Sequence, residues 1–143
     1  MTDYVLDTSA LLTLFKDEDG AQEIEEILAA CEGGRCRVYL PFMSLMEFEY
    51  MTLRERGRIA VDKALRILHA WPAEKVESYP EWGRRAALIK SRGRLSIADA
   101  WNAALALMHG AELIHKDPEF DQVQGLKHRR LPYKIRRPEI PLG

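Results

Sequence analysis

Residues 4–9 read Tyr4-Val5-Leu6-Asp7-Thr8-Ser9, a short apolar run that ends in a polar turn containing a carboxylate. Such a run predicts a short buried strand that stops at Asp7. Residues 112–115 predict a second strand of this kind, and Asp117 follows it closely. Because short strands alternate with helical periodicity between these two points, we expect an α/β domain with a mostly parallel sheet covered on both faces.

The remaining elements follow from apolar periodicity and from the glycines and prolines that interrupt it. We expect strands over residues 4–6, 37–40, 75–77, 112–115 and 126–131. We expect helices over residues 10–15, 20–32, 44–56, 61–68, 80–92 and 96–109. These elements form one domain over residues 1–131 without an internal repeat, and the Pro-rich, basic residues 132–143 are predicted to be a loose tail.

Composition limits the class of protein. The chain has 143 residues, of which 47% are hydrophobic and 30% charged, as expected for one globular domain. Its apolar runs are far shorter than the roughly 20 residues of a membrane span, and residues 1–6 contain no visible export signal. We therefore expect a cytoplasmic protein without a membrane partner. Cys31 and Cys36 are too few for a disulfide scaffold, and no second pair or nearby histidine indicates zinc.

Charge is distributed unevenly, although the formal net charge is only −1. Residues 1–50 contain 3 basic and 11 acidic side chains, whereas residues 122–143 contain 6 basic and 1 acidic. Two further features are basic segments at residues 84–94 and 127–130, which are candidates for contacts with phosphate groups. The alternative is that these segments only form the solvated polar faces of helices.

Four acidic residues lie where a predicted strand ends or a predicted helix begins: Asp7, Glu47, Asp99 and Asp117. Ligands of open parallel sheets bind outside the carboxyl ends of the strands, so these side chains are expected to meet in one pocket. Carboxylates crowded together protonate, move apart or bind cations, and an oxygen-only ligand set favours Mg²⁺ or Mn²⁺. A bound ion of this kind is suited to phosphodiester hydrolysis.

Helix capping is the competing interpretation of each acid taken singly. Residues 44–47 and 96–99 both match a capping box, and Asp117 before Pro118 matches a helix N-cap. Three further side chains are candidates for supporting the acids or binding substrate: Ser9, Asn102 and Asp121. The simpler roles are a helix cap for Ser9 and an exposed helix position for Asp121.

The chain resembles the PIN-domain family, and within it the VapC-type toxins of type II toxin–antitoxin systems. The resemblance covers residues 4 to about 132 and rests on four motifs in the family's order. These motifs are Asp7-Thr8-Ser9-Ala10-Leu11, Ser44-Leu45-Met46-Glu47, Ile97-Ala98-Asp99-Ala100 with Ala103-Ala104, and Leu113-Ile114-His115-Lys116-Asp117 with Phe120. The resemblance implies a three-layer α/β/α fold and a divalent-metal-dependent endoribonuclease that hydrolyses RNA phosphodiester bonds.

The resemblance also implies roles for the acids. Asp7 and Asp99 would be the most direct ligands of Mg²⁺ or Mn²⁺, and Glu47 and Asp117 would complete the catalytic site. The family usually has Thr or Ser two residues before its last acid, whereas this chain has His115, so the hydrogen bonding around Asp117 is left open. The resemblance further implies a homodimer and a cognate antitoxin that covers the acidic cleft.

Two other functions compete with this interpretation. One is a Mg²⁺-binding regulatory domain of phosphoacceptor type, which also places acids at strand ends but usually needs adjacent acids after its first strand. The other is a catalytically inactive PIN-like module that only binds proteins. Other enzyme classes are unsupported, because the chain contains no Gly-rich phosphate loop after a strand and no Gly-x-Ser-x-Gly motif.

Overall fold

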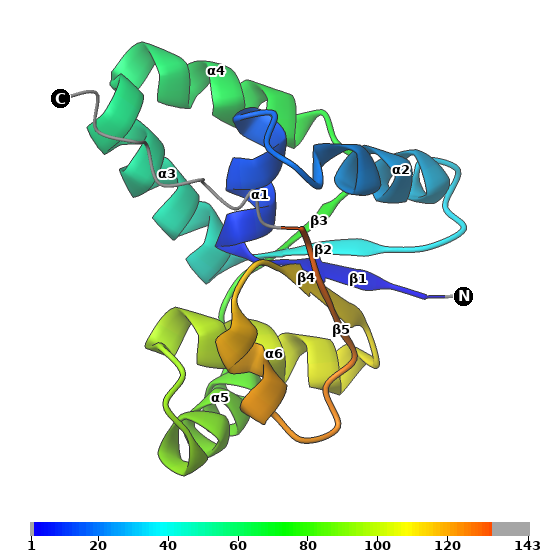
Figure 1. The fold of residues 1–143 in the computed structure, drawn as a ribbon, viewed down its shortest axis with the longest axis vertical. Coiled ribbons are helices and arrows are strands. Elements are labelled where there is room, and N and C mark those ends of the chain that lie inside the picture. The colour runs from blue at the N-terminus through cyan, green and yellow to red at the C-terminus, as the bar shows by residue number, and fades with distance from the viewer. Residues whose placement is uncertain (1, 133–143) are drawn as a thin grey trace, which may run out of the picture.

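The computed structural model describes residues 2–132 and contains a central sheet of five parallel strands (Figure 1). The strands, in chain order, are β1 (Tyr4–Leu6), β2 (Val38–Pro41), β3 (Glu74–Val76), β4 (Glu112–His115) and β5 (His128–Arg130). In space their order is β3-β2-β1-β4-β5, so β1 pairs with both β2 and β4. The predicted parallel sheet and all five predicted strands are therefore confirmed, the last of them shorter than expected.

Six α-helices and one 3-10 helix connect the strands within the described residues. They are α1 (Thr8–Phe15), α2 (Ala21–Cys31), α3 (Phe42–Arg56), α4 (Arg58–His69), α5 (Pro80–Arg92), α6 (Ile97–His109) and the 3-10 helix η1 (Pro118–Gln122). None of the helices in residues 2–132 is long and apolar enough to cross a membrane.

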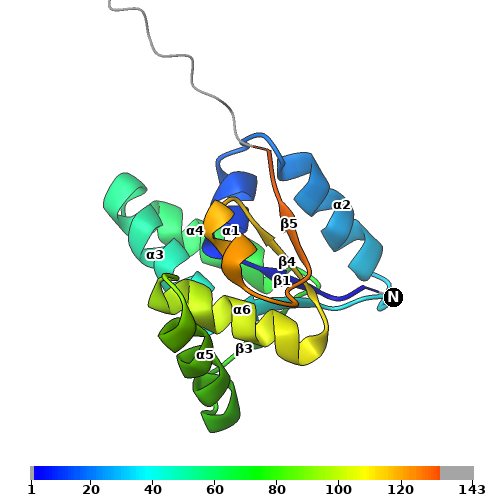
Figure 2. The same cartoon turned by 60° about the horizontal axis from the view of Figure 1, so that its bottom comes forward.

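The helices form two layers, one on each face of the sheet. Helices α1 to α4 lie on one face and α5 and α6 on the other, as Figures 1 and 2 show. Successive strand residues point to opposite faces, so Leu6 and Ile114 join the core under α1 to α4 while Val5 and Leu113 join the core under α5 and α6. The expected three-layer α/β/α architecture is thus confirmed.

The start of α3 differs from the prediction. A helix beginning at Ser44 was expected, but β2 runs into α3 at Pro41, so the helix begins at Phe42. Ser44 then lies inside the helix and is fully buried, and its hydroxyl does not cap the helix. Pro41 is both the last residue of β2 and the N-cap of α3, with φ −63° and ψ 143° in the extended region, so the helix begins at the very next residue.

Strand order places two of the predicted acids side by side. From the central strand β1 the chain passes to β2 on one side, whereas β4, on the other side, is reached only later in the chain. The crevice between such strands, at their carboxyl ends, is where open α/β sheets bind ligands. Asp7 follows β1 and Asp117 follows β4, so both residues lie at this topological switch point.

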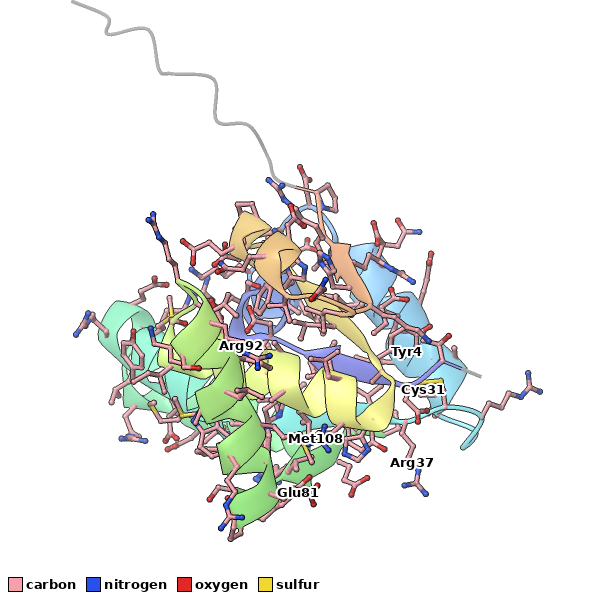
Figure 3. The ribbon with its side chains drawn as sticks, turned by 90° about the horizontal axis from the view of Figure 1, so that it is seen from below. Tyr4, Cys31, Arg37, Glu81, Arg92 and Met108 are labelled. Carbon is pink, nitrogen blue, oxygen red and sulfur yellow. A yellow bond between two sulfur atoms is a disulfide. The ribbon has the colours of Figure 1, made fainter. Side chains whose placement is uncertain are left out.

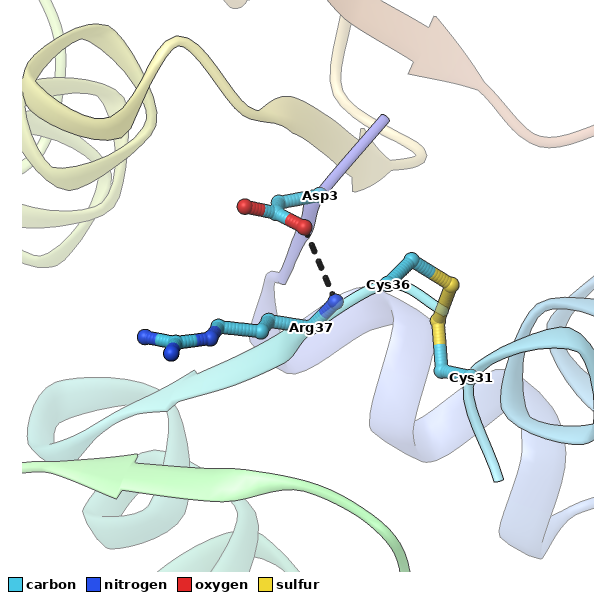
Figure 4. The surroundings of a disulfide bond; sticks show 4 residues. All are labelled: Asp3, Cys31, Cys36 and Arg37. Carbon is cyan, nitrogen blue, oxygen red and sulfur yellow. Dashed lines mark hydrogen bonds between the residues drawn. A yellow bond between two sulfur atoms is a disulfide. The ribbon is translucent and has the colours of Figure 1, made fainter. Parts of the chain in front are cut away.

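A disulfide joins Cys31 at the end of α2 to Cys36 just before β2 (Figure 4). Two cysteines are too few for a disulfide scaffold, as expected from the sequence, but they form this one short-range bond. Close by, the Arg37 backbone N–H donates a 2.9 Å hydrogen bond to Asp3. The disulfide closes a turn of four exposed residues, 32–35, before the amino end of β2, whereas Asp7 follows the carboxyl end of β1. The predicted tail lies, from residue 133 onward, outside the described residues.

Candidate metal centre

Asp7 is buried at the end of β1, with only 4% of its surface exposed. Asn102 of α6 donates a 2.6 Å hydrogen bond to its Oδ1, and Ser9 of α1 donates a 2.9 Å hydrogen bond to its Oδ2. Burial raises the pKa of the Asp7 carboxyl, the two hydrogen bonds oppose this shift, and the negative charge of Glu47 adds to it. Both oxygens are thus held in place by neutral donors.

Asn102 supports the site from the opposite helix layer. Its Nδ2 also donates to the buried hydroxyl of Ser44, at 2.9 Å, so the two amide hydrogens join α6 to β1 and α3. The Asn102 Oδ1 is buried without a hydrogen-bond partner among residues 2–132. The structure places Asn102, a candidate for supporting the acids, beside Asp7. Ser44, which was expected to cap a helix, contacts Asn102 and does not cap α3.

Ser9 and Thr8 hold the ends of neighbouring elements together. The Ser9 hydroxyl accepts the Lys116 backbone N–H at 3.0 Å, which connects Asp7 to the loop after β4. Ser9 lies inside α1 and does not cap it. The Thr8 hydroxyl donates a 2.8 Å hydrogen bond to Glu47 Oε1, which brings the middle of α3 to the start of α1.

The other three predicted acids all act on Asp99 through their negative charges. Its backbone N–H donates to the Ser96 hydroxyl at 3.1 Å, so half of the expected capping box is formed. Burial raises the pKa of its carboxyl to about 7, and the negative charges of Asp7, Asp117 and Glu47 contribute in that order. The four acids therefore share one electrostatic environment in addition to any role at helix ends.

The tightest cluster of carboxylates contains one residue that the sequence analysis did not select. Oxygen atoms of Asp99, Asp117 and Glu119 lie within 4.8 Å of one another. Asp117 Oδ1 also accepts the Glu119 backbone N–H at 2.9 Å, which caps η1 as predicted. Glu119 lies in the first turn of η1 directly after Pro118, and this short spacing from Asp117 is the only signal in the sequence that could have found it.

Gln122 connects the two chain segments that carry this cluster. Its Oε1 accepts the Arg94 backbone N–H at 2.8 Å, and its Nε2 donates to the Glu119 carbonyl at 2.8 Å. A Cβ atom at Gly93 would lie 2.5 Å from the Gln122 Oε1, so this close approach requires glycine. The loop before α6 and the 3-10 helix η1 are thereby fixed relative to each other.

His115 supplies the hydrogen bonding around Asp117 that the sequence left open. Its Nδ1 accepts the Asp117 backbone N–H at 3.0 Å, so its Nε2 carries the proton shared with His128 Nδ1 at 2.7 Å. Burial and the neighbouring His128 lower the pKa of His115 to about 4, and the imidazole is neutral. Asp121 lies 3.6 Å from the other nitrogen of His128 and outside the carboxylate cluster.

The donor set fits a hard divalent cation. It consists of carboxylate oxygens without sulfur or imidazole nitrogen, which is the set that Mg²⁺ and Mn²⁺ prefer. Burial raises the pKa of Asp99 to about 7, and the negative charges of Asp7 and Asp117 add to this shift, as expected where carboxylates are crowded. The fold and the cluster together define a parallel α/β protein with an acidic cation site at its topological switch point.

Comparison with known proteins assigns the chain to a family. The model of the PIN domain matches residues 4–126, and the chain belongs to the PIN-domain family. No curated protein sequence matches it significantly.

Solved structures with this fold include VapC toxins and VapBC complexes. VapBC2 from Rickettsia felis, bound to a DNA fragment from their promoter, aligns with a TM-score of 0.73 and 16% identity over 92% of this chain and 100% of the other. VapC20 from Mycobacterium tuberculosis, a Sarcin-Ricin loop cleaving toxin, aligns with a TM-score of 0.67 and 20% identity over 83% of this chain and 93% of its own. DNA-bound VapBC from Salmonella typhimurium aligns with a TM-score of 0.69 and 15% identity over 91% of this chain and 98% of the other. These similarities show a shared fold.

Proposed function

We propose that the protein is a divalent-metal-dependent endoribonuclease that acts as the toxin of a toxin–antitoxin pair. The observation that carries this proposal is the convergence of Asp7, Glu47 and Asp117 on Asp99, whose carboxyl has a pKa of about 7. Four carboxylates from separate elements are costly to bring together, and the cost is offset when a cation binds them. Membership of the PIN-domain family supports a nuclease as the use of this cation site.

The acids that would hold Mg²⁺ or Mn²⁺ are Asp7, Glu47, Asp99 and Asp117, joined by Glu119. Oxygens of Asp99, Asp117 and Glu119 lie within 4.8 Å of one another, whereas Asp7 and Glu47 lie outside that cluster and act on Asp99 through their charges. When bound, such an ion lowers the pKa of coordinated water and neutralises charge that develops on a phosphoryl oxygen. The protein's own contribution is to hold the acids in place. Asn102 and Ser9 orient the Asp7 carboxylate, and Asp99 keeps its proton up to a pH of about 7 until a cation displaces it.

The proposed partners are an RNA substrate, an antitoxin and a second copy of the chain. The proposed location of the protein is the cytoplasm. The VapBC complexes among the structural neighbours support an antitoxin as a partner, which we propose covers the acidic cleft. An apolar stripe on α3 supports contact with another protein: Met46, Tyr50 and Leu53 are 49%, 42% and 38% exposed and follow helical spacing.

The geometry argues against a phosphoacceptor domain. The aspartate that receives a phosphoryl group must be open to the donor, whereas Asp7 is 4% exposed and both of its oxygens accept hydrogen bonds. A catalytically inactive module is the remaining rival, and it would have no reason to keep a cation site.

A cleavage assay tests the proposal. Total bacterial RNA is incubated with the protein and Mn²⁺, and new RNA 5′ ends are mapped. We expect cleavage by the wild type, loss of cleavage in Asp99→Asn and Asp117→Asn, and loss with EDTA. Asp62→Asn, an exposed change on α4, is the matched control and should cleave normally. Absence of cleavage by the wild type, or normal cleavage by both site variants, would overturn the proposal.

A further inference from the structure

A groove of about 700 Å³ lies between α5, α6 and η1. Its apolar lining includes Leu88, Leu95, Leu107 and Val123. Leu88 is 50% exposed and Leu107 is 36% exposed, so two large apolar side chains face solvent here. Exposed apolar surface gathered in a groove is typical of a binding site. Figure 3 looks onto this side of the molecule, where α5 lies beside α6 and Arg92 is labelled.

The groove carries positive charge that has no internal partner. Arg84 and Arg92 line it, are exposed, and make no ion pair within residues 2–132. They lie eight positions apart on α5, with Leu88 midway, so they share one helix face and are separated by about 12 Å along the axis. The neighbouring Arg85 is paired with Glu81 at 3.7 Å. Two free guanidinium groups at this spacing suit a chain of phosphates.

The groove lies next to the segment that carries the acidic cluster. Gly93 and Gln122 line it, and the Gln122 side chain donates to the carbonyl of Glu119, whose carboxylate belongs to the cluster. A strand of nucleic acid whose cleaved phosphate lies at the acids would therefore reach the groove within a few nucleotides. The unpaired arginines and the proximity of the groove to the acids both favour a nucleic-acid strand as the occupant.

We propose that this groove binds the single-stranded RNA segment next to the cleaved bond. Arg84 and Arg92 contact its phosphates, and bases lie against Leu88 and Leu107 or stack on the guanidinium planes. The arginines provide affinity rather than catalysis, since neither contacts an acid of the cluster among the described residues. This inference rests on the proposed function and assigns part of its substrate site.

Fluorescence anisotropy with a labelled single-stranded oligouridine tests the groove. EDTA is present so that the RNA stays intact, and affinity is measured over a series of salt concentrations. The test variant is Arg84→Glu/Arg92→Glu. The control is Lys63→Glu/Arg66→Glu, which makes the same change of charge at exposed positions of α4, in the layer on the other face of the sheet. Circular dichroism and thermal melting verify that both variants fold.

We expect the Arg84→Glu/Arg92→Glu protein to bind at least about tenfold more weakly, and the control to bind like the wild type. The slope of log K against log salt should fall by about 1.4, since each lost contact with a single strand removes about 0.7. Equal binding by the two variants would overturn the proposal, and so would a wild type that does not bind. A protein segment would then be the remaining occupant.

Failure of this proposal can be distinguished from failure of the proposed function. Calorimetric titration with Mn²⁺ should give the same affinity for the wild type and the Arg84→Glu/Arg92→Glu variant, because the groove arginines are not cation ligands. A wild type that binds Mn²⁺ and cleaves RNA, but whose RNA affinity is unaffected by the double substitution, refutes the groove alone. A wild type without a Mn²⁺ site refutes the nuclease.

Discussion

Asn102 donates a 2.6 Å hydrogen bond to the carboxylate of Asp7, although the two residues are 95 positions apart in the chain. The bond crosses from the α6 layer to the end of the central strand, and the second amide hydrogen of Asn102 is donated to the Ser44 hydroxyl. Because the Asp7, Ser44 and Asn102 side chains are all buried, water has little access to replace a hydrogen-bond partner that is removed. One side chain thus sets the position of the most buried acid in the site.

Asn102→Ala is expected to lower the free energy of unfolding by about 1–3 kcal/mol, because it leaves the buried Asp7 and Ser44 oxygens without their donor. Urea denaturation in EDTA measures this change. Ser44→Ala is the control and should lose less, since it keeps the hydrogen bond to Asp7. A variant as stable as the wild type would show that this bond does not hold the site together.

Asp99 makes the stability of the metal-free protein depend on pH. Its pKa is raised from 3.8 to about 7 in the folded chain, so between these values the folded state holds a proton that the unfolded state has lost. Stability therefore falls as pH rises through this window. The buried Asp7 contributes in the same direction, so the wild-type profile alone does not isolate Asp99.

Comparison with Asp99→Asn isolates the effect, because asparagine has no proton to lose. We expect the variant to match the wild type near pH 4 and to exceed its free energy of unfolding by about 1–2 kcal/mol above pH 7, a value reduced for the partial exposure of this side chain. Urea denaturation in EDTA at several pH values measures the difference. A difference that stays constant across the window would mean that Asp99 is an ordinary surface carboxylate.

Gly93→Ala tests how Glu119 is positioned. The new Cβ would displace the flexible end of Gln122 rather than backbone, so folding should be nearly unaffected while the contact between Gln122 and the loop before α6 is lost. We expect about tenfold weaker Mn²⁺ binding by calorimetry.

Two further variants complete this experiment. Gln122→Ala should weaken Mn²⁺ binding to the same extent, and combining it with Gly93→Ala should add nothing, as expected for two changes in one contact. Gly33→Ala is the matched control, because a Cβ there meets no atom within 4 Å. Independent, additive effects of the two site variants would exclude the shared contact.

Reduction of the Cys31–Cys36 disulfide should lower the free energy of unfolding by about 2 kcal/mol, the value expected for so short a loop. Mn²⁺ affinity should stay the same, because the bond lies at the amino end of β2 and the acids at the carboxyl ends of β1 and β4. Denaturation and calorimetry with and without dithiothreitol measure both quantities. A large loss of Mn²⁺ affinity on reduction would contradict this prediction.

The fold was largely predictable because local signals agreed with the final structure. Short apolar runs such as residues 4–6 can only be buried strands in a chain of this size, and glycines such as Gly93 and Gly110 end the helices where the periodicity stops. The start of α3 was predicted wrongly because Ser44 matches a capping box as well as any true cap. Only its burial under Asn102 shows that it is not one.

The four acids of the site were predictable from the sequence, whereas several of the residues that hold the acids in place were not. Asp7 and Asp117 follow strands directly, so the topology alone brings them together. Glu119 and Gln122 were missed because their position depends on the path of a single turn of 3-10 helix, and Thr8 because its hydrogen bond to Glu47 spans 39 positions. The disulfide was missed because spacing does not reveal whether two cysteines face each other.

The most direct test of the cation site is a calorimetric titration of the folded protein with Mn²⁺ near pH 7. We predict saturable binding accompanied by proton release, at least about tenfold weaker in Asp99→Asn and in Asp117→Asn and unchanged in Asp62→Asn. Absence of saturable binding by the wild type, or equal binding by all three variants, would contradict the assignment of these acids to a metal centre.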